Sequence, residues 1–134
     1  MKKLKILCII LMLLSPVANA GERNYSQQFA RCSKVASNGD AQADCVTAEI
    51  AAQKNRLNKA YENVVKKLAP EDKVYLDKVQ REWITWRDDN YNFLAEHVSG
   101  SFGTTRGTSL DFMLRSVFDR ASELEMISDE MGGH

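Results

Sequence analysis

The sequence predicts an all-α fold: an antiparallel helical bundle of three long helices plus a short N-terminal helix stapled by a disulfide. Three observations lead to this prediction. Apolar residues recur every three or four positions in three long segments, as on the buried faces of amphipathic helices. Turn signals rich in Gly, Pro, Ser and Asn separate the segments. No segment alternates apolar and polar residues as a β-strand would, so packed helices are expected.

The first twenty residues have the pattern of a secretory signal peptide. Lys2, Lys3 and Lys5 precede the apolar run Ile6–Leu14, and a small-x-small site ends at Ala20, where we expect cleavage. The apolar run is too short for a membrane span, and no later run is long enough to be one. We therefore expect a periplasmic or secreted protein.

Cleavage leaves 114 of the 134 residues, which suits one small domain. We expect residues 21–128 to form this domain and residues 129–134 to be a frayed tail. The mature chain keeps 15 basic and 18 acidic residues, a net charge of −3. It lacks the basic surface that nucleic-acid binding requires. A weakly acidic chain is compatible with a basic partner, although such a charge is also ordinary for a soluble protein.

The cysteines predict one disulfide. Cys8 leaves with the signal peptide, so Cys32 and Cys45 remain as a pair in an exported chain. A loop of this length gives a stabilisation on the order of 3 kcal/mol. The chain has no Cys-x-x-Cys motif, and only His97 and His134 supply imidazoles. We expect neither a metal site nor a cofactor.

The first helix is expected over Tyr25–Val35, because Ser37-Asn38-Gly39-Asp40 is a strong turn signal. The second begins around Ala41 to Asp44 and reaches about Leu68. The expected disulfide would join the first helix to the start of the second. The apolar face of the second helix consists of Ile50, Leu57, Tyr61, Val64 and Leu68.

The third helix is expected from Pro70 to about Val98. Proline suits the first helical position, and Glu71 and Asp72 place negative charge in the first turn. The fourth is signalled by Thr108 with Asp111, a possible capping box. Its apolar face runs through Leu110, Leu114, Val117, Ala121 and Leu124 to Ile127.

Both tryptophans of the chain lie in the third helix, in one stripe with Leu76, Val79, Asn90, Leu94 and His97. This position favours core packing of Trp83 and Trp86 over a role as exposed binding anchors. Arg87 borders the stripe. We expect it to pair with an acid on another helix, for which the candidates are Glu49, Glu62, Asp119 and Glu123.

Several motifs between residues 45 and 124 together resemble the lysozyme inhibitor LprI-like family of small exported bacterial proteins. They are Cys45, Leu57-Asn58, Tyr61, Gln80-Arg81, Trp83, Trp86-Arg87-Asp88, Ser99-Gly100-Ser101, Arg120 and Leu124. The resemblance implies binding and inhibition of lysozyme, with Trp83, Trp86, Arg87 and Asp88 as the structural signature.

The resemblance also implies a second disulfide in many relatives, after the Trp-Arg-Asp motif and in the last helix. Here those places read Asn90-Tyr91 and Phe112-Met113. We therefore expect aromatic and methionine packing to hold the two helices together instead.

The segment Ser99–Gly107 is expected to be a loop and is the candidate binding site. Loops on rigid helical frames commonly carry function. Phe102 would supply an apolar tip and Arg106 a cation suited to the two carboxylates of a lysozyme cleft. A plain interhelical linker is an equally good interpretation. The candidate binding residues are Ser99, Gly100, Ser101, Phe102 and Arg106.

The favoured function is therefore an exported protein that binds a lysozyme or another cell-wall hydrolase. The alternatives are an immunity-like protein, or an envelope structural or stress protein without lysozyme inhibition. An enzyme is disfavoured, because His97 has no recognisable catalytic Ser or Cys partner nearby in sequence. The acidic pairs Glu71-Asp72 and Asp88-Asp89 are adjacent and so point different ways on a helix.

Overall fold

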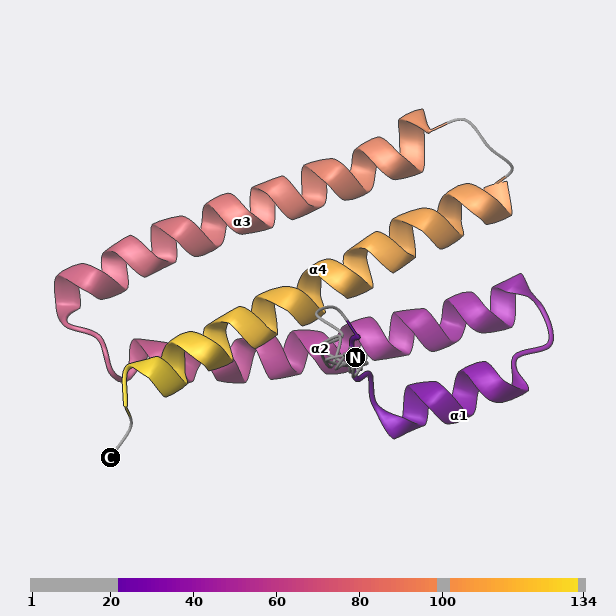
Figure 1. The fold of residues 1–134 in the computed structure, drawn as a ribbon. Helices are drawn as coiled ribbons and strands as arrows, with labels where there is room; N and C mark the ends of the chain where they lie inside the picture. Colours follow the sequence, from indigo (N-terminus) through magenta and orange to yellow (C-terminus); the bar gives the residue numbers. More distant parts are fainter. Residues whose placement is uncertain (1–21, 99–101, 133–134) are drawn as a thin grey trace, which may run out of the picture.

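The computed structural model describes residues 22–98 and 102–132, without the side chains of residues 102–105. It confirms the predicted all-α fold. The four helices are α1 (Gln27–Val35), α2 (Gly39–Val65), α3 (Pro70–His97) and α4 (Phe102–Glu130), and successive helices run antiparallel (Figure 1). The predicted signal peptide lies outside the described residues. Within them, no helix is both long and apolar enough to cross a bilayer.

Side-chain caps and a proline fix the starts of the first three helices. The Ser26 hydroxyl accepts a hydrogen bond from the Phe29 N–H, and Asn38 Oδ1 accepts one from the Ala41 N–H. Because Asn38 is the cap, α2 begins at Gly39, slightly earlier than expected. Pro70 opens α3 as predicted.

The core lies mainly between α2 and α4, which make the most extensive helix contact of the fold. It consists of Leu57, Ala60 and Val64 of α2 and Val117, Ala121 and Leu124 of α4. The next largest contact is that of α3 with α4, on the side away from α1 (Figure 1). Gln80 is the only buried residue of α3, so this helix is attached through a narrow stripe of half-buried side chains.

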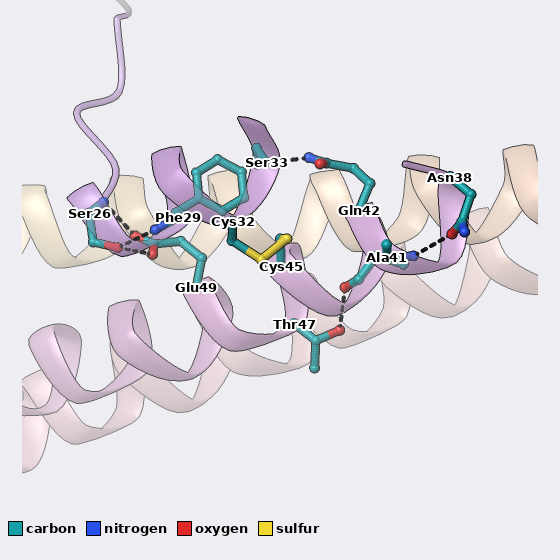
Figure 2. Close-up of a disulfide and its surroundings, with 11 residues drawn as sticks. Ser26, Phe29, Cys32, Ser33, Asn38, Ala41, Gln42, Cys45, Thr47 and Glu49 are labelled. Atoms are coloured by element: carbon teal, nitrogen blue, oxygen red, sulfur yellow. Dashed lines mark hydrogen bonds between the residues drawn. A yellow bond between two sulfur atoms is a disulfide. The ribbon is translucent and has the colours of Figure 1, made fainter. Parts of the chain in front are cut away.

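The short helix α1 is stapled to α2 by the predicted disulfide. Cys32 and Cys45 are bonded with their Cα atoms 5.7 Å apart (Figure 2). Near the free end of α1, Arg23 forms a bidentate ion pair with Asp119 of α4, through two bonds of 2.8 Å. The segment before α1 is thus bound directly to α4, while the disulfide binds α1 to α2.

The expected loop Ser99–Gly107 is mostly wrong. α4 begins at Phe102 rather than at Thr108, so the described part of the segment, residues 102–107, is helical. Gly107 has ordinary helical backbone without a positive φ, and glycine inside a helix costs only about 1 kcal/mol relative to alanine. The helix also continues to Glu130, into the tail that we expected to fray.

Candidate functional site

A cluster around Trp83 joins α3 to α4. Arg120 is buried, and its Nε donates to Gln80 Oε1 at 2.9 Å. The guanidinium of Arg120 lies 6.0 Å from the centre of the Trp83 ring, and that of Arg87 lies 5.0 Å from it. Trp83 itself packs against the core, as predicted. Two arginines thus flank one half-buried indole, in the arrangement favourable for cation–π attraction.

Trp86, in contrast, is not a core residue. Its side chain is 53% exposed, and it packs only at the surface, 5.7 Å from the ring centre of Phe112. The apolar face of α3 that the sequence predicts is wider than the part of α3 that packs against α4. The side of α3 that packs against the bundle is centred nearer to Gln80, so Trp86 lies at the edge of the contact and is exposed to solvent. The contact of Trp86 with Phe112 provides the expected aromatic packing between α3 and α4, while Met113 packs against the core of α2 and α4.

The expected partner of Arg87 on another helix was also wrong. Arg87 pairs with its neighbour Asp88, through bonds of 2.8 Å from Nε and 2.7 Å from Nη2 to Oδ1. Of the four candidates, Asp119 is paired with Arg23 and Glu123 with Arg120. The Arg87 side chain is only 14% exposed, so most of this cation is removed from water.

A groove of about 400 Å³ runs between α2 and α3 beside this cluster. It combines cations, aromatic rings and amides. Family motifs supply most of the lining, because Asn58 and Tyr61 on α2 face Gln80, Arg81 and Trp83 on α3 across it. Of the four residues that the sequence marked as a structural signature, Trp83 and Arg87 therefore also line an accessible groove.

A second hollow, of about 380 Å³, is lined by the first turns of α2 and of α4. The starts of these two helices lie at the same end of the bundle (Figure 1). Arg106 borders it and contacts Asp40 through Nη1 and Oδ1 at 3.3 Å. Both side chains are accessible, 39% for Arg106 and 92% for Asp40. Of the other candidate binding residues, Ser99, Gly100 and Ser101 lie outside the described residues. Phe102 is placed at the first turn of α4, without its side chain.

Glu49 is a buried carboxylate that the sequence offered only as a partner for Arg87. It accepts hydrogen bonds from the Ser26 N–H at 2.9 Å and from the Ser26 hydroxyl (Figure 2). It accepts a third from Gln53 Nε2 at 2.8 Å. Burial alone raises the pKa of Glu49, but the hydrogen bonds from Ser26 and Gln53 outweigh it and hold the pKa below its usual value. This carboxylate on α2 therefore binds Ser26, the N-cap residue of α1, and has a structural role.

Sequence reasoning missed the long-range pairs Arg23–Asp119 and Arg56–Glu125, because nothing local links residues that far apart. His97 is exposed and lies 5.9 Å from the ring centre of Phe93. Among the described residues, no group of three His, Cys, Asp or Glu side chains is arranged to hold a metal ion.

The family model described as lysozyme inhibitor LprI matches residues 32–124 of the chain. The matched region begins at the first disulfide cysteine and ends at a core leucine of α4, so it spans the disulfide, the core and both hollows. No curated protein and no solved structure matches the chain significantly.

Proposed function

The chain belongs to the lysozyme inhibitor LprI family, and from this membership we propose that it is exported and inhibits a lysozyme or a related peptidoglycan hydrolase by binding it. The observation that carries the proposal is the family match over residues 32–124. The signal-like first twenty residues and the disulfide suit a protein of the periplasm or the cell exterior. The net charge of the mature chain, −3, suits a basic partner, as many lysozymes are.

We propose that the contact with the enzyme is made by the end of the bundle where α4 begins, through Arg106 and the candidate binding residues Ser99, Gly100, Ser101 and Phe102. A rigid helical frame holds this end, because the starts of α2 and α4 meet there. The ion pair of Arg106 with Asp40 is exposed, and such pairs contribute about 0–1 kcal/mol. Arg106 can therefore leave Asp40 for a carboxylate of the enzyme cleft at small cost.

The test measures clearing of cell walls by lysozyme as the protein is added. Inhibition should rise in proportion to the added protein and be complete near equal molar amounts, because the mode is binding rather than turnover. Arg106→Ala should weaken inhibition by about tenfold, the typical effect of losing an arginine at the centre of an interface. No inhibition by excess protein across several lysozyme classes contradicts the proposal.

Arg115→Ala is the matched control. Arg115 lies on the same helix, is 46% exposed, and pairs with an aspartate, as Arg106 does. The control should inhibit like the unaltered protein. Equal weakening by both substitutions would mean that general charge, rather than the proposed end of the bundle, determines binding.

A further inference from the structure

The groove between α2 and α3 has a local charge opposite to that of the whole chain. Its described lining carries the three cations Lys54, Arg81 and Arg87 against the acid Asp77, and Asp88 just outside the lining pairs with Arg87, so a net charge of +1 remains. The mature chain, in contrast, has more acidic than basic residues. An excess of positive charge in a hollow attracts anions and repels a basic protein partner. The groove therefore suits a ligand other than a basic lysozyme.

Two of these cations can contact a ligand with little rearrangement. Arg81 is exposed and pairs with Asp77 one turn away on α3, a type of pair that contributes only a few tenths of a kcal/mol. Arg87 is already held in place against Trp83 and by Asp88, so little side-chain freedom remains to be lost on binding. Planar guanidinium groups bind carboxylates through two parallel hydrogen bonds.

The remaining lining fits a sugar better than an acidic peptide. Tyr61 and Trp83 offer aromatic surface with a polar tip, and the amide of Asn58 both donates and accepts hydrogen bonds. The part of α2 that lines the groove, from Lys54 to Tyr61, is roughly 10 Å long. This length suits a short ligand, and the volume of about 400 Å³ lies in the range of small-molecule sites.

We propose that the α2–α3 groove binds a saccharide that carries a carboxylate. The arginines and Lys54 bind the carboxylate, the aromatic residues pack against the ring, and Asn58 bonds its hydroxyl or amide groups. The site is separate from the proposed lysozyme contact at the end of the bundle, so either proposal can fail while the other stands.

The test uses N-acetylmuramic acid as the probe and N-acetylglucosamine as its counterpart, since the two differ by a carboxylate-bearing ether. Each is titrated into isotope-labelled protein purified from the periplasm, and the two indole N–H resonances are followed by NMR. Trp83 lines the groove while Trp86 lies outside its described lining, and the chain has no other tryptophan. We expect the acidic sugar to shift the Trp83 resonance, to leave that of Trp86 in place, and to bind at least fivefold tighter than the neutral sugar.

Two substitutions of exposed cationic residues on α3 test whether the groove binds the carboxylate. Arg81→Gln should weaken binding of the acidic sugar by about fivefold. Lys78→Gln is the control, because Lys78 is also exposed and paired one turn away on α3, but lies outside the described lining of the groove. Circular dichroism verifies that both variants keep their helices. Equal binding of the two sugars, no binding, equal effects of the two substitutions, or binding of an acidic peptide instead would each overturn the proposal.

Discussion

Replacing Gly107 by alanine should stabilise the protein, although the sequence pattern places this glycine in a loop. Gly107 has helical backbone inside α4, and a Cβ built on it meets no atom within 4 Å. Alanine therefore adds no clash, while it reduces the conformational entropy of the unfolded chain. Glycine is about 0.8–1.0 kcal/mol worse than alanine in a helix interior. Because Gly107 lies near the start of α4, we expect a gain of about 0.5–1 kcal/mol.

The assay is urea unfolding followed by circular dichroism, with thermal unfolding as a second readout. A gain of this size should raise the melting temperature by roughly 2–5 °C in a domain of this length. Gly132→Ala is the control, because Gly132 has φ +64°, a left-handed conformation that strains alanine. That variant should be neutral or less stable. A destabilised Gly107→Ala would refute the helical start of α4 at Phe102 and restore the loop.

Three further predictions concern the fastenings of the fold. Replacing Cys32 and Cys45 by serine should cost about 3 kcal/mol of unfolding free energy in denaturant titrations, and a reductant should then have no further effect. The unfolding free energy of the double serine variant should equal that of the original protein after reduction. An unchanged unfolding free energy would contradict a stabilising role of the disulfide. The pKa of Glu49 is lower in the folded than in the unfolded state, so its contribution is present above the unfolded pKa and is lost as the pH falls through the folded value. Unfolding free energy should therefore fall as the pH drops below about 5, and Glu49→Gln should flatten this dependence; an unchanged slope would be evidence against the assignment. Gln80→Ala leaves buried Arg120 without the acceptor of its Nε and should cost about 1–3 kcal/mol, measured in the same titrations. A change below about 0.5 kcal/mol would show that water replaces the amide.

Local signals predicted most of the fold. Asn38, Pro70 and the two cysteines act within a few residues or through simple pairing, and the structure places a cap, a helix start and a staple at these positions. Apolar spacing located the core leucines because each long helix buries one face. These inferences needed no knowledge of how the helices are arranged.

The candidate site was harder to predict, because its residues depend on how α3 is rotated against α4. A helical wheel assigns Trp83 and Trp86 to one face of α3. Only the packed structure shows that Trp83 is half-buried against the core while Trp86 is exposed. The partner of Arg87 was likewise not predictable from the sequence. Asp119, one of the candidates, is paired with Arg23, and Arg87 pairs with its neighbour Asp88. In the glycine-rich segment, the number of glycines suggested a loop, yet the small cost of Gly103 and Gly107 did not prevent a helix from Phe102 onward.

The narrow attachment of α3 has a consequence for how the molecule opens. A disulfide holds α1, and a continuous apolar core holds α2 to α4, whereas the α3 contacts described above are side-chain packing and one buried amide. We expect α3 to be the first cooperative unit to detach, with faster native-state hydrogen exchange of its amides than of those in α2 and α4. The rings of Trp86 on α3 and Phe112 on α4 form a non-covalent contact at the solvent-exposed edge of the α3–α4 interface. Opening of this contact breaks no covalent bond, so we expect detachment of α3 to be independent of the redox state of the disulfide.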